Sequence, residues 1–243
     1  MENALTAALS RQIVLARALE TTANNIANQT TAGFKAERIE FREYLARAPG
    51  IGGDGAPVSL VFDPDSYTDF SAGGMEATYN DLDFAIEGDG FFGVETEAGL
   101  RYTRDGRFSM NADGELVTRS GARVLDAGGA PILIDPEAGP LVLSNDGVLQ
   151  QNGVNIGALG VFRFEEPRAL AKEGANLFAA DAEPLSAPSP RIRQGFIETS
   201  NVAPIAAVTD MIEIMRAYEQ AARVIESSDE LVRNTIRTLS QAA

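Results

Sequence analysis

Apolar side chains near the N-terminus recur with the period of an α-helix. They follow one another at alternating steps of four and three residues, and Gln12 is the only polar residue in the series. This spacing is the heptad pattern, which places the series along one side of a helix. We therefore predict a helix that ends near the polar cluster 24–31 and Gly33. The apolar members of the series are Leu5, Leu9, Ala16, Leu19, Ala23 and Ile26.

A longer series with the same period occupies the C-terminal segment. Thr199, Ser200 and Asn201 precede it and offer side chains that cap a helix start, and the first turn tolerates Pro204 because its missing N–H would be unpaired there. We predict a helix from Pro204 almost to the end of the chain. The apolar series consists of Val208, Met211, Met215, Tyr218, Ala222, Ile225, Val232, Ile236 and Leu239, interrupted by Asp229.

Each apolar series has two possible partners. A helix of this kind can pack against the core of its own chain, as most amphipathic helices do. Here both helices exceed the average length of about 11–12 residues, and both keep the 3.5-residue period of a coiled coil. Because they lie at opposite ends of the chain, we expect them to pair with each other and then with copies from other subunits.

The middle of the chain has a different pattern, in which glycines punctuate short apolar and β-branched runs between residues 90 and 160. Asp105-Gly106, Asp113-Gly114 and Asn152-Gly153 are dipeptides that favour tight β-hairpin turns. The pattern predicts an antiparallel meander or a small barrel. Residues 36–80 contain a cluster of glycine and proline and are expected to form an extended connector.

The expected fold class is therefore α+β. Long N- and C-terminal helices pair as a coiled-coil-like core domain, and a central antiparallel β-rich meander or barrel forms a second domain. The expected boundaries are 1–35 for the N-terminal axial helix, 36–80 for the connector, 81–193 for the β-rich domain and 194–243 for the C-terminal axial helix.

Composition removes several classes of function. The 243 residues include no His, Cys or Trp, so catalytic pairs and metal sites that need histidine or cysteine are excluded. The net charge of −15 argues against binding to nucleic acid or to an anionic membrane surface. No basic segment with an apolar run opens the chain, and no run approaches the roughly 18 apolar residues of a membrane span. Neither a cleaved signal peptide nor a membrane anchor is expected.

The acidic residues do not form a recognisable site. The segments 63–69 and 111–115 space their oxygens like calcium loops, but the first lacks the required glycine and the second is a predicted hairpin turn. Pairs such as Asp81 and Asp83 fit either acid/base chemistry or a solvated face of a strand. We expect no catalytic residue, no cofactor and no metal.

Three segments together resemble the flagellar rod and hook axial proteins. They are ANNIANQTTAGFK at 23–35, the stretch from EGDGFFGVETE to GARVL at 87–125, and the stretch from QGFIETSN to VRNTI at 194–236. The resemblance implies terminal helices at the inner face of a tubular assembly and a β domain outside them. The YTRDG block at 102–106 and the short chain are similar to rod members of the family. Within these, the proximal-rod type fits better, and the distal-rod type is the alternative.

The resemblance implies a structural subunit of the bacterial flagellar basal-body rod that polymerises through its terminal helices and transmits torque. The implied partners are other proximal and distal rod subunits and the flagellar type III export apparatus, with no nucleic acid and no membrane insertion. The implied location is the rod, which spans the periplasm, after export without a cleaved signal peptide. From other classes, a carboxylate-based wall-acting hydrolase and a soluble helical binding module remain alternatives.

The implied subunit interface combines both helical series with the end of the first helix. That end contributes neutral amides, which can cap a helix or bind backbone groups without bringing charge into a dry contact. The added residues are Asn24, Asn25, Asn28, Gly33 and Phe34.

Overall fold

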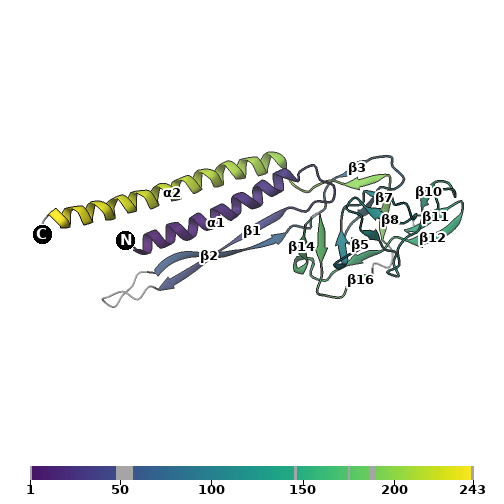
Figure 1. Cartoon of the computed structure of the whole chain (residues 1–243), viewed down its shortest axis with the longest axis horizontal. Helices are drawn as coiled ribbons and strands as arrows, with labels where there is room; N and C mark the ends of the chain where they lie inside the picture. Colours follow the sequence, from purple (N-terminus) through teal and green to yellow (C-terminus); the bar gives the residue numbers. More distant parts are fainter. Residues whose placement is uncertain (1, 48–56, 145–146, 175, 187–189, 242–243) are drawn as a thin grey trace. The chain divides into compact units, whose positions relative to one another are not determined.

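The computed structural model describes residues 2–47, 57–144, 147–174, 176–186 and 190–241 (Figure 1). Within them the chain forms two compact units. Unit 1 contains residues up to 27, residues 37–67 and residues from 203 onward, and unit 2 contains residues 28–36 and 68–202. The chain therefore passes between the units four times.

Unit 1 consists of two helices and a two-stranded sheet. Helices α1 (Glu2–Ala27) and α2 (Pro204–Gln241) lie side by side and run antiparallel (Figure 1). Strands β1 (Glu37–Arg47) and β2 (Pro57–Thr68) pair with each other, although Thr68 itself belongs to unit 2. The two predicted helices are confirmed, and α2 begins at the expected proline. Coiled-coil packing between them stays a prediction.

The segment 36–80 is more regular than the connector expected from its sequence. It contains β1, β2 and the short strand β3 (Met75–Ala77), and it is divided between the two units. The boundaries that we expect for the four domains therefore remain predictions.

Unit 2 is built from short antiparallel strands. Its largest sheet has the strand order β14-β15-β6-β5-β9-β8-β7, and β13 joins β5 to β16. Separate small sheets pair β10-β11-β12, β17 with β4, and β18 with β3. Among the described residues the sheets do not close, so the meander is confirmed and the barrel is not.

The remaining elements of unit 2 are short. The strands are β4 (Phe84–Glu87), β5 (Phe91–Thr96), β6 (Gly99–Thr103), β7 (Phe108–Met110), β8 (Leu116–Thr118), β9 (Arg123–Val124), β10 (Leu141–Leu143), β11 (Val148–Gln151), β12 (Val154–Ala158), β13 (Val161–Arg163), β14 (Ala171–Glu173), β15 (Leu177–Ala179), β16 (Leu185–Ser186), β17 (Arg191–Gln194) and β18 (Phe196–Glu198). One turn of 3-10 helix, η1, spans Pro167–Ala169.

Two apolar clusters hold unit 2 together. The larger one centres on Phe84, Phe92 and Leu116, which are fully buried. The smaller one is aromatic, and within it the Tyr102 ring meets the Phe164 ring edge-on, with 4.8 Å between centroids. Such contacts favour a defined packing geometry over a loose apolar core.

Two of the three predicted hairpin turns are confirmed. Asp113-Gly114 connects the paired strands β7 and β8, and Asn152-Gly153 connects β11 and β12 with both residues at positive φ. The prediction for Asp105-Gly106 is wrong, because β6 and β7 on either side of it do not pair with each other. Gly106 is required for a different reason: an added Cβ would lie 1.7 Å from the carbonyl oxygen of Phe84.

We predict that Gly106→Ala lowers the free energy of unfolding by about 3 kcal/mol, at the upper end of the range for overpacking a core. The backbone of β4 has to move to admit the methyl group. Urea unfolding followed by near-ultraviolet circular dichroism, which reports the packed Tyr and Phe side chains, measures the effect.

Gly128→Ala is the matched control, because the nearest atom to its added Cβ is a side-chain oxygen, the Asp126 Oδ1 at 3.3 Å, and not a backbone atom. Its unfolding free energy should stay within about 0.5 kcal/mol of the unmutated protein. Equal effects for the two variants would contradict the close approach at Gly106.

Candidate assembly interface

Helix α1 is apolar on two sides, and its own chain covers only one of them. Val14 and Ala18 are buried, whereas Leu9 and Ile13 are 52% and 55% exposed. Leu9 and Ala18 are nine residues apart, a rotation of about 900° that puts them on opposite sides of the helix. An apolar helix side without a covering partner is therefore part of the folded subunit.

Helix α2 carries a similar uncovered side along its first half. Ile205 is 86% exposed, and Val208, Ile212 and Met215 are each 46–47% exposed. Their spacing of three, four and three residues places them along one side of the helix. Contiguous exposed apolar residues of this kind mark interaction surfaces in soluble proteins. We call the exposed large apolar residues of α1 and of the first half of α2 the axial surface: Leu5, Leu9, Ile13, Ile205, Val208, Ile212 and Met215.

The predicted interface residues fall into four groups in the structure. Leu5, Leu9, Ala23, Asn24, Val208 and Met215 are exposed. Ala16, Leu19, Asn25, Ile26, Asn28, Met211, Tyr218, Ala222 and Ile225 are half-buried. Gly33 and Phe34 are buried by their own chain within unit 2, and the side chains of Val232, Ile236 and Leu239 lie outside the described residues.

Gly33 and Phe34 are enclosed by their own chain. Phe34 is 2% exposed, and the Lys172 ammonium lies 4.1 Å from the centre of its ring. An interface role for these two residues stays a prediction. In contrast, Ile13, Ile205 and Ile212 belong to the axial surface although the heptad series omitted them.

Asn25 uses its amide as the sequence analysis expects of a neutral residue near a helix end. Its Oδ1 accepts a hydrogen bond from the Glu37 N–H at 3.0 Å, and its Nδ2 donates to the Glu37 carbonyl at 2.8 Å. The side chain thus imitates a paired strand residue. It joins the last turns of α1 to the first residue of β1 without adding a charge.

A buried charge cluster in unit 2 unites the segments that carry the family resemblance. The Glu198 carboxylate lies 2.7 Å from the Lys35 ammonium and 3.3 Å from the Arg104 guanidinium. All three side chains are at most 4% exposed. Lys35 comes from the GFK segment, Arg104 from YTRDG and Glu198 from GFIETSN. No spacing in the sequence indicates that these three charged residues pair, because they lie far apart along the chain.

The cluster survives burial because each charged group has several partners. The Lys35 ammonium also donates to the Ser71 carbonyl, Arg104 donates to the Gly88 carbonyl, and the Gly73 N–H donates to Glu198. Burial lowers the pKa of Lys35 and of Arg104, because a low-dielectric environment disfavours their charged forms, and Glu198 offsets part of each shift. The pKa of Lys35 is lowered further by the Arg104 charge.

Asn201 extends this cluster to the chain segments beside it. Its Oδ1 accepts from the Ala36 N–H, and its Nδ2 donates to the Asp69 carbonyl at 2.7 Å. The Gly33 N–H donates to the Glu198 carbonyl at 2.7 Å. Every segment through which the chain enters or leaves unit 2 is therefore bonded to Glu198 or to Asn201.

The polar side chains of the segment 111–115, which resembles a calcium loop in sequence, stabilise the turn between β7 and β8 by hydrogen bonds. The Asn111 Oδ1 accepts from the N–H groups of Asp113 and Glu115, and its Nδ2 donates to the Glu115 carboxylate at 2.9 Å. The side chains of Asp63 and Asp65 lie outside the described residues. Among those described, no group of three or more acidic side chains is arranged to hold a metal ion.

Comparison with known proteins places these features in a family. Three family models match in chain order: "Flagella basal body rod protein" at residues 4–35, "Flagellar hook protein FlgE/F/G D1 domain" at 85–151, and "Flagellar basal body rod FlgEFG protein C-terminal" at 193–238. The flagellar basal-body rod protein FlgF of Caulobacter vibrioides is 42% identical over 243 residues, covering 99% of both chains. This chain belongs to the flagellar basal-body rod protein family.

Other relatives are rod proteins named FlgF or FlgG. FlgF of Mesorhizobium japonicum is 39% identical, covering 96% of this chain and 98% of its own. FlgG of Bacillus subtilis is 30% identical, covering 90% and 92%. The resemblance to the axial family is confirmed. Because it is a family of structural proteins, the alternative of a wall-acting hydrolase is set aside.

No helix in the described part of this rod protein is both long enough and apolar enough to cross a membrane.

We predict that Glu198→Gln lowers the free energy of unfolding of this rod protein by about 3–5 kcal/mol, the cost of leaving buried charge without its counter-ion. The substitution keeps the shape of the side chain but leaves the Lys35 and Arg104 cations facing a neutral amide. Thermal and urea unfolding of the full chain measure the change.

Glu173→Gln provides the comparison, because Glu173 pairs with Arg101 at 2.6 Å while its side chain is 47% exposed. Its cost should not exceed about 1 kcal/mol. A Glu198→Gln variant as stable as Glu173→Gln would show that the buried cluster does not depend on the carboxylate charge.

Proposed function

We propose that this chain is a proximal-rod subunit of the bacterial flagellar basal body, of the FlgF type, that polymerises through its terminal helices into a torque-transmitting shaft. The single observation that supports it most is the axial surface, which this member of the rod family leaves uncovered on both helices. The likeness to FlgG at lower identity leaves a distal-rod subunit as the second candidate.

Burial of the axial surface supplies the free energy for assembly. A large apolar side chain that leaves water contributes on the order of 1.5–3 kcal/mol, and the half-exposed residues contribute the part that is not already buried. Association and ordering of the helices subtract several kcal/mol from this gain. One helix alone is therefore a weak contact, and a stable joint requires the apolar sides of both α1 and α2.

The two uncovered sides differ in sequence, so the α1 side of one subunit can contact the α2 side of the next in a head-to-tail contact. A symmetric dimer needs a patch that matches itself, whereas contacts between two different patches generate rings or helical filaments. A shaft of stacked subunits is such a filament. The proposed partners are therefore copies of this chain and other rod subunits.

We further propose that the chain reaches the rod through the flagellar type III export apparatus. The absence of cysteine means that no disulfide can lock the chain during passage. The terminal helices would gain their final order at the growing end, because an isolated helix depends on tertiary contacts for most of its stability.

We predict that Ile212→Asp prevents incorporation into basal bodies and abolishes swimming. The new carboxylate would be buried without a partner at the subunit joint, whereas in the free subunit the side chain is partly exposed. Immunoblots of isolated basal bodies measure incorporation, and circular dichroism of the purified variant checks that the subunit folds.

Gln220→Asp, at an exposed polar position beyond the axial surface, is the matched control and should be incorporated normally. Normal swimming with Ile212→Asp, in a variant confirmed by sequencing, would refute assembly through this side of α2.

Limited proteolysis separates the rod subunit from a soluble helical binding module. For a rod subunit we predict that purified protein loses residues near 1–30 and 205–243 rapidly, while a fragment that contains the core of unit 2 persists, because the helices lack their neighbours. Mass spectrometry of a time course identifies the cleavage sites. Helices that resist cleavage as long as unit 2 does would favour the self-contained module.

A further inference from the structure

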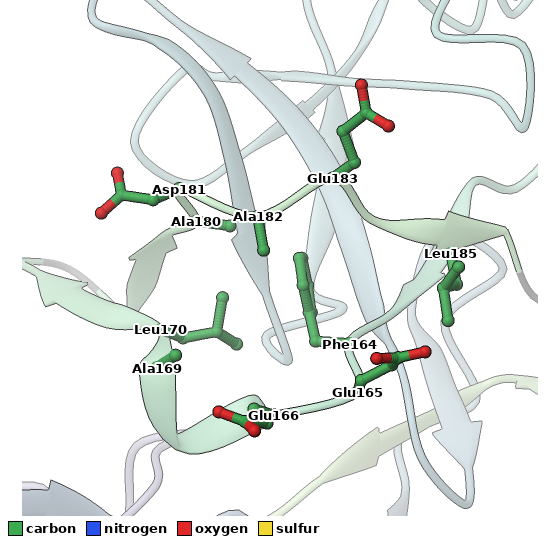
Figure 2. Close-up of a pocket in the computed structure, with 10 residues that line it drawn as sticks. All are labelled: Phe164, Glu165, Glu166, Ala169, Leu170, Ala180, Asp181, Ala182, Glu183 and Leu185. Atoms are coloured by element: carbon green, nitrogen blue, oxygen red, sulfur yellow. The ribbon is translucent and has the colours of Figure 1, made fainter.

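A pocket of about 480 Å³ opens on unit 2 beside η1 (Figure 2). Its apolar lining consists of Phe164, Ala169, Leu170, Ala180, Ala182 and Leu185. Figure 2 shows Leu170, Ala182 and Phe164 around a common space in the middle of the view. The volume lies within the range of protein pockets that enclose a ligand group, and it has room for an aromatic side chain.

Four carboxylates surround this apolar floor. Glu165 and Glu166 come from the segment after β13, and Asp181 and Glu183 from the segment before β16. All four are exposed, and none has an ion-pair partner among the described residues. Arg168 lies in the same stretch but does not line the pocket. An occupant with an apolar body and a positive edge would match both features.

A patch elsewhere on unit 2 has this chemistry. Tyr79 is 90% exposed, the largest exposed fraction among the described large apolar and aromatic residues, and Met75 nearby is 37% exposed. The Arg193 guanidinium lies 3.9 Å from the centre of the Phe196 ring and 4.0 Å from the Met75 sulfur. Arg193 is exposed and has no carboxylate partner in the described part of the chain. We call these four residues the Tyr79 patch.

The backbone holds Tyr79 in an unusual conformation. Its φ is +58°, a strained value that a bulky residue keeps only where its surroundings impose it. The N–H groups of Thr78 and Tyr79 both donate to the Gly195 carbonyl, at 2.8 Å and 3.2 Å. These two hydrogen bonds fix the backbone at Tyr79, and the side chain is exposed to solvent. Tyrosine and arginine are the residue types that most often carry binding energy at protein interfaces.

We propose that the acidic pocket of one subunit receives the Tyr79 patch of a second copy of this chain. Tyr79 fills the apolar floor, its phenol O–H donates to a rim carboxylate, and Arg193 pairs with the acids beside it. Charge complementarity selects this occupant, because the four carboxylates and Arg193 all lack an ion-pair partner among the residues that the structure describes. The inference rests on the proposed function, because it describes contacts between neighbouring subunits in the assembled rod.

The two halves of the contact lie on different parts of unit 2. The patch lies on β3, β17, β18 and the segment after β3, whereas the pocket lies between β13 and β16, and Figure 1 shows β3 and β16 well separated. A subunit therefore offers a patch to one neighbour and a pocket to another. Repetition of such a head-to-tail contact builds a ring or a helix of subunits.

Cysteine pairs test the contact against a background that contains no cysteine. We expect a chain with both Arg191→Cys and Ala182→Cys to form a ladder of disulfide-linked dimers, trimers and larger species when basal bodies are oxidised. Arg191 is exposed on the same strand as Arg193, so the substitution leaves Tyr79 and Arg193 in place. Gels run without reductant show the ladder, and reductant should collapse it to monomer.

The matched control combines Arg191→Cys with Leu133→Cys, an exposed apolar position that does not line the pocket. It should give no ladder beyond dimer. If basal bodies contain the pocket variant but oxidation yields no ladder, this inference is overturned while the proposed function stands. If the unmutated chain is missing from basal bodies altogether, the proposed function itself fails.

A charge exchange gives an independent readout. Arg193→Glu alone should reduce the amount incorporated into basal bodies at least about tenfold, the size expected of a central interface residue. Combining it with Glu165→Arg and Glu166→Arg should restore incorporation. A triple variant that remains as poorly incorporated as Arg193→Glu, although it folds, would argue that the arginine does not meet this pocket.

Discussion

The buried carboxylate of Glu198 is the interaction on which the rest of unit 2 depends. One acid accepts from Lys35, from Arg104 and from the N–H of Gly73, and its own backbone carbonyl accepts from Gly33. A group with this many donors is costly to bury alone and stable when all are present, because each partner offsets the loss of water. The cluster links residues that lie 163 positions apart, so it forms only when both ends of the chain have met.

Local patterns in the sequence predicted both helices and the strands between residues 90 and 160, because those elements follow from residue spacing. The absence of glycine and proline from both ends marked α1 and α2, and Pro204 marked the start of α2 correctly. Strands β1 and β2 were missed because the glycines and prolines at residues 49–57 are typical of a connector and outweighed the alternation of charged and apolar residues at 38–42 and the apolar run at 60–62. The hairpin prediction at Asp105-Gly106 was wrong for another reason. Glycine is required there because the backbone carbonyl of Phe84, which is distant in sequence, leaves no room for a side chain.

Only part of the candidate interface could be predicted from the sequence, because local spacing does not show how distant segments pack. A heptad series shows which side of a helix is apolar, but the packing of its own chain decides which apolar residues stay uncovered. The structure shows that Val14, Ala18 and Ala221 are buried. It also shows that Ile13, Ile205 and Ile212 are exposed, which the sequence pattern alone does not indicate. Likewise, Lys35 and Glu198 look like ordinary surface charges in the sequence. Their pairing is a property of the fold.

The hydrogen bonds around Glu198 and Asn201 also have a mechanical consequence. All the chain segments that enter or leave unit 2 carry backbone bonds to these two residues: Gly33 and Ala36 on one segment, Asp69 and Gly73 on another, and Asn201 on the third. A pull on any one of these segments is therefore shared by the other two, and several bonds must break together before the chain can be drawn out. A load distributed over several hydrogen bonds in this way suits a structural subunit of the flagellar rod.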